Sequence, residues 1–127
     1  MSNTENIKNF DEDLAKFIAV QGISVDKAVR TIAMRLYNGI TQMTPIDTGR
    51  AKGNWNMGIG APNLTINEGA TSIQPFNPKI GDGLKTIYIT NNLPYINVLE
   101  YGDANREPVG MVKVTMNNVK VEIGNVI

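Results

Sequence analysis

The stretch 25–43 limits the possible folds of this chain more than any other part of the sequence. Its apolar side chains recur at steps of three and four residues, the period of an amphipathic helix. The members of this stripe are Val25, Ala28, Val29, Ile32, Ala33, Leu36, Tyr37, Ile40 and Met43. Thr44 precedes Pro45, and a residue before proline is disfavoured in the helical conformation. The sequence therefore predicts a long helix that buries one face in a core and ends at Thr44.

A shorter helix is predicted before it, from Phe10 to about Gln21. Its apolar positions are Phe10, Leu14, Phe17 and Ile18, and the acidic run 11–13 suits the positive end of a helix dipole. Gly22 is expected to end this helix, and Ser24 is expected to cap the start of the next one. Residues 1–8 are polar and are expected to be flexible.

Two short strands are predicted at 54–59 and 85–90, because apolar side chains alternate in both. In the first, Trp55 and the alternate residues after it share one side, and the single tryptophan is expected to be buried. Residues 64–67 could add a third strand. The stretch 61–84 between the strands is rich in proline, glycine and asparagine, so it is expected to be a long loop, or an arm that orders against a neighbour.

The C-terminal part leaves one choice open. A short helix is predicted from near Pro94 to Tyr101, with Gly102 as its end. In 110–124 valines alternate as in a strand, and strand propensity favours that structure. The residues Val112, Met116, Val119 and Ile123 equally form a helical stripe. The fold class is α+β: two N-terminal helices, a small and mostly antiparallel sheet, a short helix after the last strand, and a C-terminal helix or strand.

Composition narrows the classes of function. A chain of 127 residues is long enough for one domain with a single core, here taken as 1–127. It has neither cysteine nor histidine, which excludes disulfides, the usual zinc sites and every Ser-His or Cys-His dyad. Basic and acidic residues number twelve each, so the net positive charge of a general nucleic-acid binder is missing. Neither a signal peptide nor a membrane span is recognisable, and synthesis in a cytoplasm is expected.

Carboxylates are the remaining candidates for catalysis. Asp47 and Glu100 could meet as a general acid and base. Alternatively, Asp47 caps a turn and Glu100 forms an ion pair with Arg50, and this structural interpretation is favoured. No glycine-rich phosphate loop is present, so no cofactor is expected.

Two further groups of side chains could contact nucleic acid. Arg30, Arg35, Arg50 and Lys52 could form a basic patch, although solvated faces and salt bridges between subunits are favoured. Tyr88, Tyr95 and Tyr101 could stack on bases, but tyrosines near turns more often anchor protein contacts.

Three motifs in a fixed order carry a family resemblance. They are TPIDTGRAKGNW at 44–55, NNLPYINVLEYG at 91–102 and GMV at 110–112. Together they resemble the tail-completion family of neck or minor tail proteins from long-tailed bacteriophages. The matching positions are Thr44, Pro45, Asp47, Thr48, Gly49, Arg50 and Trp55; Asn92, Leu93, Pro94, Tyr95, Glu100 and Gly102; and Gly110, Met111 and Val112. The match covers about 25–119. Residues 73–84 depart from the family, because they contain prolines where relatives are often helical.

The resemblance implies a non-enzymatic virion protein, made in the bacterial cytoplasm, that forms a ring of six subunits or a multiple of six. The implied neighbours are head-closure or connector proteins on one side and tail terminator or tail tube proteins on the other, with passing contact to phage DNA. It favours a helix for 110–124. The interface candidates are Asp47, Thr48, Gly49, Arg50, Trp55, Asn92, Pro94, Tyr95, Glu100 and Tyr101. We expect 48–52 and 92–101 to pack together and to position the long loop against a neighbouring subunit.

Three alternative functions stay open. A tail terminator would have a similar size and would also form a ring. A small hydrolase would use Asp47 and Glu100. A module that contacts DNA would bind with a steep dependence on salt.

Overall fold

The computed structural model describes residues 3–46 and 49–126, and in this part of the chain it contains four α-helices and one sheet of two strands. The elements follow in the order α1 (Asn3–Gln21), α2 (Val25–Met43), β1 (Asn56–Ile59), β2 (Ile87–Thr90), α3 (Ile96–Tyr101) and α4 (Met111–Val126). Short 3-10 turns occupy Lys52–Asn54 (η1) and Asp82–Leu84 (η2). The predicted α+β class is confirmed.

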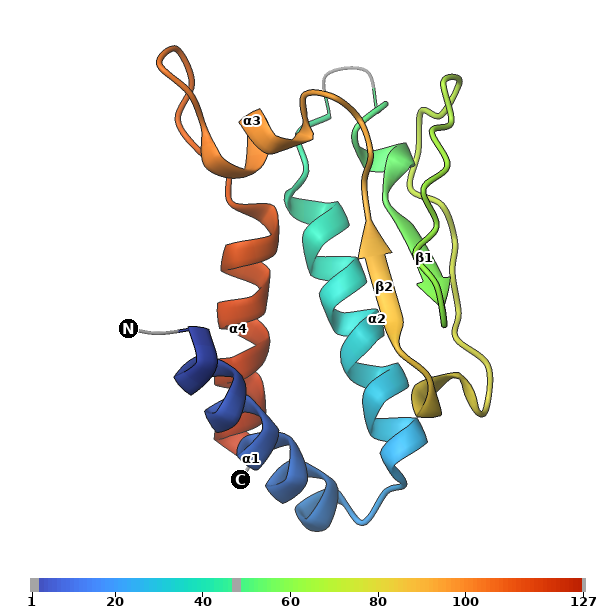
Figure 1. The fold of residues 1–127 in the computed structure, drawn as a ribbon, viewed down its shortest axis with the longest axis vertical. Coiled ribbons are helices and arrows are strands. Elements are labelled where there is room, and N and C mark those ends of the chain that lie inside the picture. Colours follow the sequence, from blue (N-terminus) through green and yellow to red (C-terminus); the bar gives the residue numbers. More distant parts are fainter. Residues whose placement is uncertain (1–2, 47–48, 127) are drawn as a thin grey trace.

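The helix α2 is the axis of the fold, with α1 and α4 along one side and the sheet along the other (Figure 1). Its predicted bounds are confirmed, because Val25 is its first residue and Met43 its last. The Ser24 hydroxyl accepts a hydrogen bond from the backbone N–H of Lys27 at 3.1 Å, as expected of an N-cap. At the other end, Thr44 has extended backbone angles, which fits its place before proline.

The first helix is longer than predicted. It ends at Gln21, and Gly22 follows with a φ of 64°, but it begins at Asn3 instead of near Phe10. No glycine or proline lies between Asn3 and Gln21. The helix can therefore extend through its polar first turns without a residue that stops it.

The sheet is smaller than the sequence allowed. β1 and β2 pair antiparallel, with Asn56 opposite Thr90 and Ile59 opposite Ile87. Residues 64–67 do not add a strand to it. A Cβ on Gly58 would lie 2.1 Å from the carbonyl oxygen of Ala61, so the chain after β1 turns back across the outer face of the sheet. Glycine at 58 leaves the space for that crossing.

The segment 61–84 contains no helix or strand apart from the turn η2, as predicted. It runs beside β1 on the side away from α4 (Figure 1). The body of the same chain holds it at several points: Asn54 bonds to Asn67, the Tyr37 hydroxyl lies 2.7 Å from the Gln74 carbonyl oxygen, and the carboxylate of Asp26 receives the N–H groups of η2 and of the residue before it. In this structure the segment is a loop fixed by contacts within its own chain.

The C-terminal segment, for which the sequence left helix and strand open, is a helix. α4 packs against both α1 and α2, which explains why helical burial wins over strand propensity. Its buried residues are Met111, Thr115, Val119 and Ile123. Two members of the predicted stripe were wrong, since Met116 is 42% exposed and Val112 is half-buried. The buried face begins one residue earlier than the apolar pattern indicated.

Two apolar clusters fill the interior on either side of α2. The first joins α1, α2 and α4 and consists of Phe17, Ala28, Ile32, Val119 and Ile123. The second joins α2 to the sheet, α3 and the start of α4, and consists of Ala33, Tyr37, Ile40, Ala51, Trp55, Met57, Leu93, Leu99 and Met111. The second cluster lies under all three family-like motifs.

Candidate functional site

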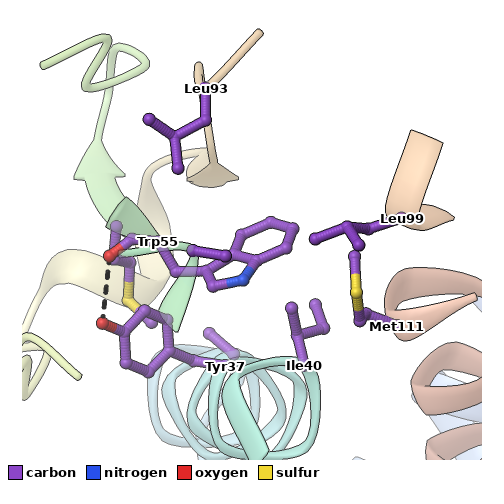
Figure 2. Close-up of a cluster of buried hydrophobic side chains, with 9 residues drawn as sticks. Tyr37, Ile40, Trp55, Leu93, Leu99 and Met111 are labelled. Carbon is purple, nitrogen blue, oxygen red and sulfur yellow. Dashed lines mark hydrogen bonds between the residues drawn. The ribbon is translucent and has the colours of Figure 1, made fainter. Parts of the chain in front are cut away.

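Trp55 lies at the centre of the second cluster and is 4% exposed, as the sequence predicts. Its indole lies among the side chains of Tyr37, Ile40, Leu93, Leu99 and Met111 (Figure 2). The indole Nε1–H donates to the hydroxyl of Thr44 at 2.9 Å, and this hydroxyl donates to the carbonyl of Ile40 at 2.8 Å. The first motif therefore closes on itself, because its threonine anchors its tryptophan.

Tyr37 extends this anchor toward the long loop. Its hydroxyl lies 2.7 Å from the carbonyl oxygen of Gln74 and 3.2 Å from that of Trp55 (Figure 2). Burial raises the pKa of the Tyr37 hydroxyl above its usual value. The neutral hydroxyl therefore holds its proton and remains a donor to the loop.

In the turn after α2, the backbone at Gly49 lies very close to the backbone of the long loop. Gly49 has a φ of 78°, and a Cβ there would lie 2.1 Å from the carbonyl oxygen of Thr71. Glycine is required at 49 for both reasons. The predicted turn at Asp47 and Thr48 lies outside the described residues.

Arg50 does not pair with Glu100, so that expectation was wrong. Its Nη2 lies 2.8 Å from the carboxylate of Glu68 in the long loop, and its guanidinium lies 5.9 Å from the ring centroid of Tyr95. That ring distance is within the range of a cation–π contact. Arg50 therefore links the first motif to the loop and to the second motif.

Glu100 instead caps α4. Its two carboxylate oxygens accept the backbone N–H groups of Val112 at 2.9 Å and Lys113 at 3.1 Å. The first N–H groups of a helix have no partner within the helix, and a negative charge there is favourable. Glu100 thus joins the second motif to the third. The hydrolase alternative would need this same carboxylate for proton transfer, whereas here it has a structural role.

The contact between the first two motifs is made by a neighbour of the predicted residue. Asn91, not Asn92, donates from Nδ2 to the carbonyl of Ala51 at 3.0 Å, and its Oδ1 accepts the N–H of Leu93 at 3.1 Å. Asn92 and Pro94 are exposed. The sequence showed turn chemistry at both asparagines but gave no means of telling which one faces inward.

A shallow groove of about 400 Å³ opens beside this contact. Trp55, Ile96 and Val112 contribute its apolar lining, and Glu100 and Tyr101 lie at it as well. Tyr101 is 76% exposed and Tyr95 is 37% exposed. The two tyrosines therefore offer apolar rings with polar tips at the surface, a combination that is common at protein interfaces.

Two inward-facing polar side chains, those of Asp26 and Asn54, were not singled out from the sequence. Asp26, 9% exposed, accepts from Nε and Nη2 of Arg30 and from the backbone N–H groups of Gly81 and Gly83, at 2.7 to 3.2 Å. The Arg30 hydrogen bond, followed by that of Gly81, holds the pKa of this carboxyl below its usual value. In the sequence Asp26 looks like an ordinary acid in a first helical turn, because its backbone partners Gly81 and Gly83 lie more than fifty residues away.

Asn54 is the second. Its Nδ2 donates to the carbonyls of Arg50 and Asn67, and its Oδ1 accepts the N–H of Asn67 at 2.6 Å. It is 1% exposed and sits in η1, where the sequence predicted the start of a strand. Asn54 thereby holds the start of the long loop against the first motif.

Three of the four candidate basic side chains form ion pairs. Arg30 pairs with Asp26 at 3.0 Å, Arg35 with Glu122 at 3.5 Å, and Arg50 with Glu68. These ion pairs are formed within one chain, whereas the sequence favoured solvated faces and salt bridges between subunits. They lower the positive field that a phosphate backbone would meet.

The described residues contain no group of three or more acidic side chains that could hold a metal ion. Within 3–46 and 49–126, no helix combines the length and the apolar character that crossing a bilayer requires. Comparisons with protein-family models, with curated proteins and with solved structures found no match to this chain.

Proposed function

We propose that this chain is a structural virion protein of the bacteriophage neck, a minor tail protein that acts in tail completion and head–tail joining as a subunit of a homo-oligomeric ring. One observation carries the proposal. The three segments that resemble the tail-completion family lie far apart in the sequence, yet they pack into one unit: Asn91 bonds to Ala51, Arg50 lies over Tyr95, and Glu100 caps the helix that begins at Met111.

The chemistry of this unit supports a binding role. Arg50 forms an ion pair and Glu100 caps a helix, while Tyr101 of the second motif and Ile46 of the first remain exposed, the latter at 69%. Exposed aromatic and aliphatic side chains supported by a rigid base are typical of protein contacts. The proposed partners are other copies of the chain in a ring, head-closure or connector proteins, and tail terminator or tail tube proteins.

The direct test is electron microscopy of lysates from the phage that carries this gene, with a stop codon at Trp55. Filled heads and tails of normal length lying apart are the expected result, and supplying the intact chain in trans should restore joined particles. Overlong tails would favour the tail terminator instead. Intact infectious particles without the protein would exclude a neck function.

A point variant tests the surface without disturbing the core. Tyr101→Ala removes a ring that is 76% exposed, and it is expected to lower the fraction of joined particles while the purified variant keeps its melting temperature. Val20→Ala, which truncates a 58% exposed side chain on α1, is the matched control. Equal joining by both variants would mean that the face around α3 is not the docking face.

A further inference from the structure

The sheet leaves the outer edge of β2 without a partner. Gly60 N–H donates to the carbonyl of Thr86 at 2.8 Å, in the same register as the β1–β2 ladder. Along a strand of an antiparallel pair, the backbone N–H and C=O groups of one residue bond to the partner strand, and those of the next residue point away from it. The backbone N–H and C=O groups of Ile87 and Ile89 therefore point to the free edge of β2. No described residue forms a hydrogen bond with them there.

A second row of unpaired backbone groups lies in the loop. Residues 62–67 run without a turn or bend. The odd-numbered residues face their own chain: the carbonyl of Asn63 accepts from Thr90, that of Thr65 accepts from Asn56, and Asn67 bonds to Asn54 through both its N–H and its carbonyl. The backbone groups of the even-numbered Leu64 and Ile66 bond to no described residue.

The two rows have matching spacing. Each offers two residues that are separated by one, which places their hydrogen-bonding groups about 7 Å apart along an extended chain. Each row also carries apolar side chains, since Leu64 is 63% exposed and Ile66 is 40% exposed, and Ile87 and Ile89 are half-buried. An unpaired edge of this kind is a template for an added strand.

We propose that copies of this chain join head to tail, with residues 63–67 of one copy pairing antiparallel with β2 of the next. This inference rests on the proposed function, for which it supplies the subunit contact. One register pairs all of these unpaired backbone groups. In it, Leu64 forms a hydrogen-bonded pair with Ile89, and Ile66 forms one with Ile87. Thr65 then faces Tyr88 as a non-hydrogen-bonded pair. Beyond the paired residues, the same antiparallel direction brings Glu68, in the turn after the donor segment, toward Lys85, in the bend before β2.

That last pair identifies the occupant as a second copy. The side chain of Glu68 is 76% exposed beyond its contact with Arg50, and a carboxylate can accept from both cations. Lys85 is exposed and forms no ion pair with a described carboxylate. Opposite charges that meet at the same end of the strand pair favour this register over a shifted one.

The geometry also explains why the contact repeats. The donor segment crosses the outer face of β1, whereas the acceptor is the lateral edge of β2, so the two surfaces differ. A contact between two different surfaces is heterologous and passes from copy to copy, and it gives a ring where the rotation between copies closes. A strand pair this short buries far less than the roughly 1,200 Å² of a stable interface, so isolated subunits are expected to associate weakly.

Disulfide trapping tests the register, and the absence of cysteine from the natural chain gives a clean background. A Thr65→Cys chain and a Tyr88→Cys chain are mixed at millimolar concentration and oxidised. Cα atoms of a non-hydrogen-bonded pair lie about 4.5 Å apart, within the range a disulfide spans. The expected result is a cross-linked heterodimer in several-fold higher yield than Thr65→Cys gives with Val20→Cys, an exposed position on α1.

Charge reversal is the second arm. Glu68→Lys in the Thr65→Cys chain, or Lys85→Glu in the Tyr88→Cys chain, is expected to lower the cross-linked yield about two- to five-fold. The two reversals together are expected to restore it, which loss of the Arg50 contact alone would not do. A yield no higher than the Val20 control, or reversals that are not rescued by their combination, would overturn the inference.

The outcome is separable from that of the phage lysate. Failed cross-linking together with unjoined heads and tails would leave the neck function standing and remove only this contact. Specific cross-linking together with intact particles would remove the neck function and leave a self-associating protein.

Discussion

The indole Nε1–H of Trp55 donates to the Thr44 hydroxyl at 2.9 Å inside the core, and so joins the end of α2 to the start of β1. Both groups are almost fully buried, with Thr44 at 2% exposure. Water therefore cannot replace either partner. One hydrogen bond thus fixes both ends of the segment that connects α2 to β1.

Thr44→Val should destabilise the protein. Valine keeps the shape of threonine but leaves the indole N–H buried without an acceptor, which costs about 1–3 kcal/mol. Urea unfolding followed by the fluorescence of the single tryptophan measures the change. Thr44→Ser retains the hydroxyl and is expected to lose clearly less. Equal stability of the valine variant and the natural protein would show that this bond contributes nothing.

Asp26→Asn should change the acid sensitivity of the protein. The pKa of Asp26 is lowered in the folded state by Arg30 and by the N–H groups of Gly81 and Gly83, so its ionised form stabilises the fold. This contribution is fully present above the unfolded pKa of about 3.9 and is lost as the pH falls through the lower folded pKa.

The asparagine variant should therefore be less stable near neutral pH, and its deficit should shrink on acidification through that window. Denaturant unfolding at a series of pH values measures this difference. Asp11→Asn, at an exposed site on α1, serves as the control. A deficit that is independent of pH would contradict the role of the charge.

Gly58→Ala should destabilise the sheet. The added methyl group would meet the backbone oxygen of Ala61 at 2.1 Å, and backbone cannot move aside as a flexible side chain can. Overpacking of this kind costs about 1–3 kcal/mol. Thermal unfolding followed by circular dichroism is the measurement. Gly69→Ala is the matched control, because its Cβ meets nothing within 4 Å. If both variants melt alike, the loop does not press on β1 as described.

Glu100→Ala should weaken the start of α4. Two backbone N–H groups lose their acceptor and the helix terminus loses a negative charge, a change worth about 0.5–2 kcal/mol. Hydrogen exchange at Val112 and Lys113 is expected to accelerate, whereas Glu107→Ala in the exposed loop before α4 should leave it unchanged. Unaltered exchange in the Glu100 variant would show that the cap is not formed in solution.

For the first two family-like motifs, the sequence indicated which segments pack together but not which side chains pair. The contact of Arg50 with Tyr95 agrees with the expectation that 48–52 and 92–101 pack together, and the bond from Asn91 to Ala51 joins the two segments one residue before the expected range. The individual partners differed. Arg50 and Glu100 carry opposite charges in the two segments, and charge alone does not distinguish an ion pair between them from Arg50 with Glu68 and Glu100 with a helix terminus.

The features that the sequence determined by itself are set by neighbours in the chain. The bounds of α2 followed from its apolar period, from Ser24 before it and from Pro45 after it, and the end of α3 followed from Gly102. Only the tertiary structure decided between helix and strand for 111–126, where both periods were present and burial against α1 and α2 selected one. It also decided the long-range partners of Asp26, Arg50 and Glu100, which lie between 12 and 57 residues away along the chain. A period or a cap acts through the backbone within a few residues, whereas the partner of a charged side chain is fixed by the packing that brings distant segments together.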